Sequence, residues 1–236
     1  MPIKTAVDKD SLPKVFSSIA PYYDFLNGVL SFNNAKLWRK KSVDTVLIKE
    51  DAKILDLCTG TAEIAIEFAK RKSACQVFGI DFSWEMLKKA KDKISKLKLE
   101  KRIYLVEADV FNLPFQAEYF DIVSISFGLR NLVDYRKGVS EIVNMLKEGG
   151  QVIILEFSPP PNSVFGRVIN FYLKNMIPLI AVMFGGSLDA YNYLSSSIST
   201  FLYPEQILDC MDSAGLKNLC LKKMSYGVIN SYYGEK

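Results

Sequence analysis

Acidic residues stand at the ends of three successive apolar runs, where an α/β sheet would bind a ligand. These acids are Asp56, Asp81 and Asp109, and the first precedes a turn of small residues, 58–61, that contains Gly60. An ionised carboxylate at the end of a buried strand needs polar partners, so three such acids indicate a site more strongly than one. A strand, a small-residue turn and a helix, with an acid about 20 residues further on, form the unit in which α/β sheets hold a ribose. For Asp56 alone, an ordinary turn with a hydrogen-bonded acid is the alternative.

The turn lacks the glycines that a pyrophosphate would require. A dinucleotide-binding loop has the pattern G-x-G-x-x-G, whereas here a cysteine and an alanine flank Gly60. S-adenosylmethionine (SAM) has a ribose and no pyrophosphate, so its ribose would bind Asp81 and its charged methionine end would bind the turn. Asp109, followed by apolar Val110, could bind the adenine amino group and pack on its face. A dinucleotide-dependent oxidoreductase is the alternative, and the missing glycines argue against it.

The three segments together resemble the motif series of SAM-dependent methyltransferases with a Rossmann-like sheet. They read DLCTGTAE from residue 56, GIDFS from residue 79 and EADVFNLPF from residue 107. On these segments we assign Asp56, Gly60 and Phe82 to the cofactor site as well.

Composition excludes several classes of function. The 236 residues carry 30 basic and 26 acidic side chains, and this net charge of +4 is too small to indicate a nucleic-acid-binding protein. The absence of histidine excludes histidine metal sites, Ser-His-Asp triads and a histidine general base, and no metal is expected. Four scattered cysteines and no signal-peptide pattern predict a cytoplasmic protein with reduced thiols. The lysine-rich stretch 88–101 predicts a helix with one solvated face.

Strand and helix patterns alternate between residues 51 and 157. We expect strands near 53–57, 76–80, 102–106, 120–126 and 150–156, with helices between them such as 135–146. Gly149 and Gly150 would end that helix. A further helix and two antiparallel edge strands are expected near 204–214, 216–224 and 226–233.

The predicted fold class is therefore α/β, a doubly wound Rossmann-like sheet that is mostly parallel with an antiparallel edge strand. We expect one domain over 1–236. Its parts would be a helical cap at 1–50, a SAM-binding core at 51–157, an inserted helical lid at 162–203, and a C-terminal helix with edge strands at 204–236.

Polar residues follow the last two parallel strands. Arg130, Asn131 and Glu156 would face the ligand crevice at the carboxyl ends of these strands, which makes them candidates for catalysis. Arg130 and Glu156 could instead form a partly buried ion pair with each other.

Longer segments resemble the menaquinone/ubiquinone-biosynthesis C-methyltransferases over nearly the whole chain. They are YDFLNGVLSFNNAKLWRKK (23–41), ISFGLRNLVD (125–134), MLKEGGQVIILEFSPP (145–160) and YNYLSSSISTF (191–201). The resemblance implies SAM-dependent methylation of a ring carbon of a polyprenyl quinol. By matching positions it implies SAM contacts at Thr61, Asp81, Asp109, Val110 and Ser126. It also places Arg130 and Asn131 beside the quinol.

The chain departs from the pattern of that family at three positions. A glycine and a histidine are usual where this chain has Asn33 and Ala35, and a C-terminal histidine corresponds to Tyr232. These departures leave the headgroup open between demethylmenaquinol and a benzoquinol of the ubiquinone pathway.

Ring methylation requires that a quinol hydroxyl lose its proton and that the aryl oxide be stabilised. Arg130 stays charged at any working pH and can stabilise the oxide. Without histidine, the proton would leave through a carboxylate, a tyrosine or a chain of water, and Asp109 and Glu156 are both candidates. A methyltransferase for a soluble small molecule and a SAM-binding protein without catalysis are the alternatives.

The stretch 164–203 is apolar with a few interspersed cations. Its uninterrupted apolar piece, 176–184, contains Pro178 and is shorter than the roughly 20 residues of a membrane span. We expect a mobile helical lid that contacts the inner face of the membrane reversibly, where a polyprenyl quinol resides. The candidate residues are Phe165, Ile169, Phe171, Tyr172, Met176, Ile180 and Phe184, with Arg167 and Lys174 for lipid headgroups. A homodimer interface and plain core are the alternatives.

Overall fold

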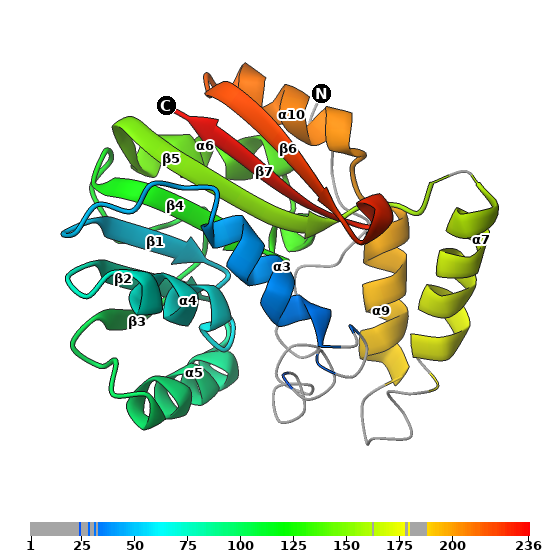
Figure 1. Ribbon diagram of the computed structural model, residues 1–236, viewed down its shortest axis with the longest axis horizontal. Coiled ribbons are helices and arrows are strands. Elements are labelled where there is room, and N and C mark those ends of the chain that lie inside the picture. Colours follow the sequence, from blue (N-terminus) through cyan, green and yellow to red (C-terminus); the bar gives the residue numbers. More distant parts are fainter. Residues whose placement is uncertain are drawn as a thin grey trace.

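A seven-stranded sheet forms the middle layer of the protein, and helices cover both of its faces (Figure 1). The structure is a computed structural model that describes residues 24, 28, 31, 33–161, 163–177, 179 and 188–236. The strands are β1 (Lys53–Leu57), β2 (Gln76–Asp81), β3 (Ile103–Glu107), β4 (Phe120–Ser126), β5 (Leu146–Phe157), β6 (Lys217–Met224) and β7 (Ile229–Glu235). Their order across the sheet is β3-β2-β1-β4-β5-β7-β6. β1 to β5 run parallel and β7 is antiparallel to both of its neighbours, which confirms the predicted fold class.

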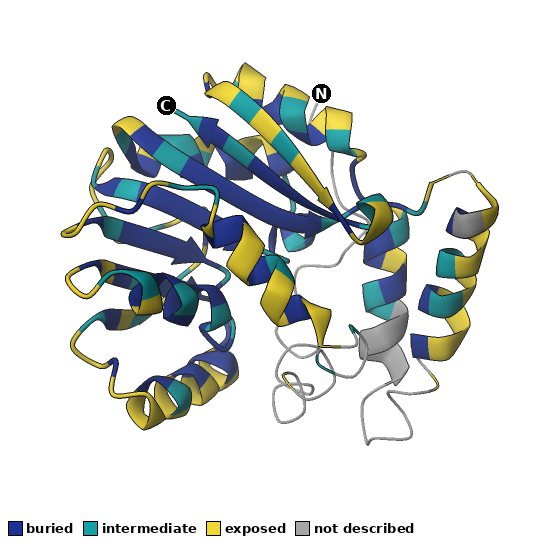
Figure 2. Cartoon of the chain, viewed as in Figure 1, coloured by how far each residue is buried: buried dark blue, intermediate teal, exposed yellow. Residues whose placement is uncertain are grey.

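The sheet separates two apolar cores. The described helices are α3 (Asn34–Val43), α4 (Glu63–Arg71), α5 (Trp84–Lys96), α6 (Tyr135–Met145), α7 (Val164–Phe171), α9 (Leu188–Ser199) and α10 (Pro204–Ser213). In β1, Leu55 and Leu57 face the core under α6 and α10, whereas Ile54 faces the core under α3, α4 and α5. Figure 2 shows the consequence: the central strands are buried along their length, and the helices are exposed on their outer sides.

The lysine-rich stretch forms α5, as its pattern predicted. Leu87, Ala90 and Ile94 are buried on one side of this helix, and most of its lysines are exposed on the other. The Ser83 hydroxyl accepts a hydrogen bond from the Met86 N–H and so caps the first turn. The sequence therefore fixes both the orientation of this helix and its starting point.

Three expected boundaries were wrong: the end of α6, the start of β5, which begins at Leu146 rather than near residue 150, and the start of the last strand. Gly149 and Gly150 do not end α6, which stops at Met145; they lie within β5, where the pairing with β4 shifts its register between Phe120 and Ile122. Gly149 has a φ of 71°, a backbone conformation that glycine adopts readily and that the irregularity in the strand requires. The last strand begins at Ile229 rather than at residue 226, because 225–227 form the short turn η3 (Ser225–Gly227), in which every φ is positive.

The N-terminal part of the chain is described only in places. Residues 1–23, 25–27, 29, 30 and 32 of the expected helical cap lie outside the described residues, whereas 34–43 form α3. None of the helices in the described ranges is long and apolar enough to span a membrane.

Gly128 lets the chain after β4 touch the turn after β1. A Cβ atom at position 128 would lie 2.5 Å from the Cys58 Cβ and 2.8 Å from its Sγ. Cys58 itself has a φ of 52°, a conformation that favours glycine. This contact joins the two loops that carry the predicted cofactor and catalytic residues.

We predict that Gly128→Ala lowers the free energy of unfolding by about 1–3 kcal/mol, because the new methyl group overlaps the Cys58 side chain. Cys58→Gly removes the overlapping atoms and suits the positive φ, so the double variant should recover most of the loss. Urea denaturation of the four proteins measures this. A double variant as unstable as Gly128→Ala would show that Cys58 is not the cause.

Candidate functional site

The turn after β1 has an unusual backbone. Cys58, Gly60 and Ala62 have φ values of 52°, 55° and 63°, which is the left-handed region. Two of these three residues are not glycine, so the turn stores strain of the kind that is found at functional sites. A Cβ on Gly60 would meet no atom within 4 Å, so this side of the turn is open to a ligand.

Asp81 ties this turn to the end of β2. Its Oδ2 accepts a hydrogen bond from the Gly60 N–H at 2.8 Å, and its Oδ1 accepts one from the Ser83 N–H at 2.9 Å. The side chain is buried, and burial raises the pKa of Asp81 to about 6 against the opposing effect of these hydrogen bonds. The Phe82 N–H also donates to this carboxylate. Three donors leave one of its four lone-pair positions for a ribose hydroxyl.

Asp56, near the end of β1, holds the turn through two hydrogen bonds. The Thr59 hydroxyl donates to its Oδ2 at 2.6 Å, and the Ser124 hydroxyl of β4 donates to its Oδ1 at 2.8 Å. Burial raises the pKa of Asp56 to about 6, partly offset by these two hydroxyls. Both oxygens are used inside the protein, so the contribution of Asp56 to this edge is to fix the turn.

The other predicted cofactor residues line the same edge of the sheet. Asp81 pairs with Glu107 in the sheet register, so Asp109 and Val110 follow directly beside it. Asp109 is exposed and accepts a hydrogen bond from the Phe111 N–H at 2.9 Å, whereas Val110 is buried. Phe82, next to Asp81, is partly buried.

The Ser126 hydroxyl is a further group at this edge that suits a polar ligand. Its hydroxyl is buried at the end of β4 and has no hydrogen-bond partner among the described residues. A buried hydroxyl without a partner is costly unless a ligand or water binds it. With the open side of Gly60 and the lone-pair position left on Asp81, this hydroxyl fits a polar ligand such as SAM.

Arg130 and Glu156 form the buried ion pair that the sequence had left as an alternative. Arg130 lies in η1 (Leu129–Asn131), and its Nη1 is 2.6 Å from Glu156 Oε1 and 2.6 Å from the Phe127 carbonyl oxygen, to both of which it donates. The side chains are 6% and 0% exposed. Burial raises the pKa of Glu156, and the Arg130 charge opposes this. The guanidinium is therefore held in one orientation.

Tyr193 is a site residue that the sequence reasoning did not single out. Its hydroxyl donates to Asn131 Oδ1 at 2.7 Å, which joins α9 to η1. Burial raises the pKa of Tyr193 to about 12, so it is a hydrogen-bond donor at working pH. In the sequence, Tyr193 belongs to the tyrosine segment at 191–201, and nothing in that segment indicates that Asn131 is its hydrogen-bond partner.

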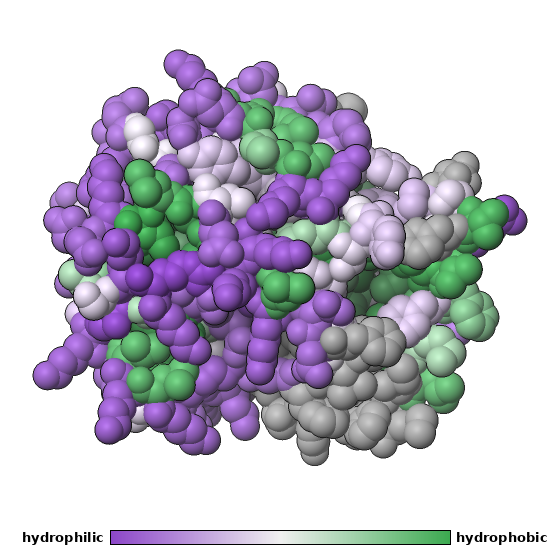
Figure 3. Space-filling model, in the orientation of Figure 1, coloured by the Kyte–Doolittle hydropathy of each residue, from purple (hydrophilic) through white to green (hydrophobic). Residues whose placement is uncertain are grey.

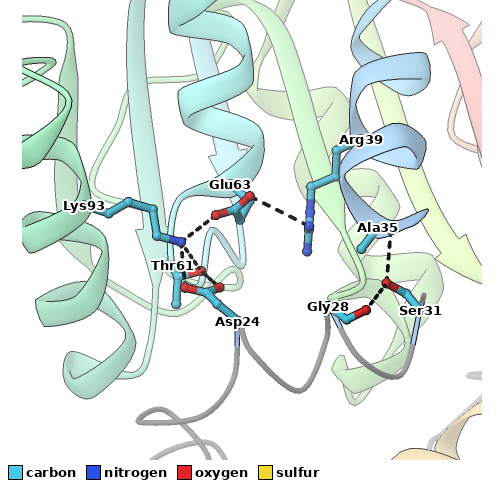
Figure 4. Close-up of polar contacts among 8 residues, drawn as sticks. All are labelled: Asp24, Gly28, Ser31, Ala35, Arg39, Thr61, Glu63 and Lys93. Atoms are coloured by element: carbon cyan, nitrogen blue, oxygen red, sulfur yellow. Dashed lines mark hydrogen bonds and ion pairs between the residues drawn. The ribbon is translucent and has the colours of Figure 1, made fainter. Parts of the chain in front are cut away.

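Lys93 and Asp24 were also missed. In Figure 4 both point toward Thr61, whose hydroxyl donates to Asp24 Oδ1 at 2.6 Å and accepts from Lys93 Nζ at 3.1 Å. Lys93 belongs to the lysine-rich helix, and nothing in its spacing distinguishes it from its solvated neighbours.

The sheet order and the polar strand ends place the protein in the Rossmann-like class of α/β folds that SAM-dependent methyltransferases share. A SAM-dependent methyltransferase from Thermotoga maritima has a TM-score of 0.68 at 17% identity, covering 94% of this chain and 99% of that one. Another from Aquifex aeolicus has a TM-score of 0.62 at 15% identity, covering 86% and 92%. At these identities the likeness shows the fold alone.

The chain belongs to the ubiE/COQ5 methyltransferase family, whose model matches residues 4–236. The demethylmenaquinone methyltransferase of Thermus thermophilus is 38% identical over 222 residues, covering 94% of this chain and 100% of the relative. The ubiquinone/menaquinone biosynthesis C-methyltransferase UbiE of Geotalea daltonii is 37% identical over 228 residues, covering 96% and 97%. The predictions of a SAM-dependent methyltransferase and of SAM as the cofactor are confirmed.

We predict that SAM affinity depends on the ionisation of Asp81. Below a pKa of about 6 the carboxyl is protonated and loses the charge to which ribose hydroxyls donate. Affinity should be steady near neutral pH and fall as the pH drops below about 6, by up to about tenfold per pH unit for one group. Calorimetric titration across this range measures it.

Asp81→Asn should bind SAM tens-fold more weakly at neutral pH, because a charge-assisted hydrogen bond contributes about 1.5–3 kcal/mol. Asp92→Asn, on the exposed side of α5, is the matched control and should bind normally. Wild-type affinity in Asp81→Asn at neutral pH would rule out the assignment of Asp81 to the ribose.

Proposed function

We propose that this protein transfers the methyl group of SAM to a ring carbon of a polyprenyl quinol, with demethylmenaquinol as the preferred acceptor. The family match over residues 4–236 carries the proposal. The relatives from Thermus thermophilus and Staphylococcus carnosus are named demethylmenaquinone methyltransferases, which supports a naphthoquinol headgroup, whereas the relative from Geotalea daltonii is named for both ubiquinone and menaquinone.

The geometry supports one continuous site for cofactor and acceptor. The loop that carries Arg130 and Asn131 touches the cofactor turn at the contact between Gly128 and Cys58. Aligning two reactants in this way lowers the entropic part of the barrier. The quinol headgroup would therefore lie between η1 and the end of β2, beside the methyl group to be transferred.

SAM, when bound, supplies an electrophilic methyl group on a sulfonium. The protein's part is to orient the acceptor carbon and to stabilise the aryl oxide. The Arg130 guanidinium is anchored by Glu156 and the Phe127 carbonyl, so it needs no reorganisation as negative charge develops on the oxide. Tyr193 holds the Asn131 amide in place beside it. In this proposal Glu156 orients Arg130, and Asp109 lies at the solvent-exposed adenine end. The hydroxyl proton, and the ring proton that the methyl group replaces, would leave to water, and the cofactor would leave as S-adenosylhomocysteine.

We also propose that α7 and the following turn of π-helix, η2 (Tyr172–Met176), contact an anionic membrane surface. The apolar side chains exposed on these two elements and just after them are Val164, Val168, Phe171, Met176 and Leu179. Hydrophobic surface lies at the right-hand edge of Figure 3, on the side where Figure 1 shows α7. Arg167 and Lys174 are exposed between them, and the sequence from 163 to 179 has no acid. An apolar surface with only positive charges suits anionic lipid.

The exposed set differs from the one expected from the sequence. Ile169 and Tyr172 are partly buried, whereas Val164 and Val168 take their places on the outer side of the helix. Ile180, Phe184 and the side chain of Phe165 lie outside the described residues. The proposed contact therefore rests on the outer side of α7.

The function is tested with the purified chain, SAM and reduced quinols of both headgroup types. We predict a singly methylated naphthoquinol from demethylmenaquinol, with less product from the ubiquinone-pathway benzoquinol, as measured by mass spectrometry. Binding of SAM without transfer to either quinol, or transfer only to soluble phenols, would contradict the proposal.

Arg130→Gln combined with Glu156→Gln is the informative variant, since it leaves no buried charge without its partner. It should lower kcat about 100-fold or more through loss of oxide stabilisation and leave SAM affinity within a few-fold.

We predict that the protein floats with anionic liposomes and that Val168→Ser with Phe171→Ser weakens this. These side chains are 61% and 60% exposed, so the changes remove apolar contact area without opening the core. Leu47→Ser with Leu97→Ser is the control, because both leucines are exposed elsewhere on the surface.

Equal flotation of the Val168→Ser, Phe171→Ser variant and the control would exclude α7 as the membrane contact. A wild-type dimer that the same variant converts to a monomer, with no flotation of either, would assign this face to a second copy of the chain.

A further inference from the structure

Lys93 lies at the centre of a charged cluster beside the cofactor turn (Figure 4). Its Nζ donates to Asp24 Oδ2 at 2.7 Å, to Glu63 Oε1 at 2.5 Å and to Thr61 Oγ1 at 3.1 Å. An ammonium group has three N–H donors, so all three have acceptors here. The acceptors come from three places in the chain: the described N-terminal residue Asp24, the cofactor turn and the first residue of α4.

The contacts of Thr61 decide what its hydroxyl can bind. The hydroxyl donates its only proton to Asp24 Oδ1 at 2.6 Å and accepts one hydrogen bond from Lys93. One acceptor lone pair remains. Any ligand at this hydroxyl must therefore donate to it, and the ammonium of the methionine end of SAM is such a donor. The methionine carboxylate cannot bind at this hydroxyl while the cluster is intact.

The charges of the cluster balance one another. Lys93 and Arg39 of α3 are positive, Asp24 and Glu63 are negative, and Glu63 Oε2 lies 4.0 Å from Arg39 Nη1. Without Lys93, the Asp24 and Glu63 carboxylates would face each other with less compensation, and Thr61 would lose one of its two fixed partners. The orientation of the hydroxyl therefore depends on Lys93.

We propose that Lys93 is a positioning residue for SAM. It holds Asp24 and Thr61 so that the Thr61 oxygen accepts a hydrogen bond from the ammonium of the cofactor, with the Asp24 carboxylate adding to the attraction. The proposal rests on the cofactor and is independent of the quinol.

The test compares Lys93→Met, which keeps the aliphatic stem, with Lys93→Arg, which keeps the charge. Lys91→Met, an exposed lysine of the same helix, is the control. By calorimetry on the full chain, Lys93→Met should bind SAM about tenfold more weakly, Lys93→Arg within about threefold of wild type and Lys91→Met normally. SAM affinity in Lys93→Met equal to that of the Lys91→Met control would overturn the proposal.

A double-variant cycle with Thr61→Val separates positioning from a general structural effect. If Lys93 acts through the Thr61 hydroxyl, Lys93→Met should weaken SAM binding little further once Thr61 is valine. Full additivity of the losses in SAM affinity caused by the two single changes would contradict the positioning role of Lys93. So would a fall in the thermal midpoint of the ligand-free Lys93→Met protein that is large enough to account for its weaker SAM binding. Failure of methyl transfer to quinols with these SAM affinities as expected would instead bear on the proposed acceptor.

Discussion

The hydrogen bonds that two buried carboxylates accept hold the turn on which the site depends. Asp81 accepts the N–H groups of Gly60 and Ser83, and Asp56 accepts the hydroxyls of Thr59 and Ser124. These contacts join β1, β2 and β4 at one point. Cys58 and Ala62 have left-handed backbone angles in this turn, and such a strained conformation persists only where several surrounding contacts hold it.

This arrangement opposes stability at neutral pH. Burial raises the pKa of Asp56 and of Asp81 to about 6, above the ordinary value of 3.8. The folded state therefore binds protons more tightly than the unfolded chain between about pH 4 and 6, and stability falls as the pH rises through that window. A cationic cofactor would offset this cost by its attraction to the two carboxylates.

The buried charged groups in the two halves of the site differ in what they leave for a ligand. The Asp81 carboxylate keeps a lone-pair position for a hydrogen-bond donor, whereas the Arg130 guanidinium is already paired with Glu156. Pairing with Glu156 holds the guanidinium in one orientation but partly cancels its positive electrostatic potential. The hydrogen bond from Tyr193 to Asn131 connects this network to α9. The contact between Gly128 and Cys58 sets the distance between the two halves, so a change in either loop alters both.

The sequence by itself determined the class of fold and the gathering of three acids at one edge of the sheet. The apolar runs in the sequence predicted β1 to β4 within a residue or so of their observed ends. The acids at 56, 81 and 109 lie at or just after those ends. These features are local: a buried strand must be apolar, and a polar residue at its end must face a ligand or a partner. The glycines at 149 and 150 misled because a strand irregularity and a helix end require the same backbone freedom.

Only the tertiary structure decided which polar groups meet. Arg130 pairs with Glu156, Tyr193 with Asn131, and Lys93 with Thr61 and Asp24, all across long stretches of the chain. A lysine on a solvated helix face and a lysine with three hydrogen-bond acceptors, such as Lys93, look alike in the local sequence. Their difference lies in the acceptors that other segments bring within hydrogen-bond distance, and the packing of α4 and α5 on the sheet sets that distance.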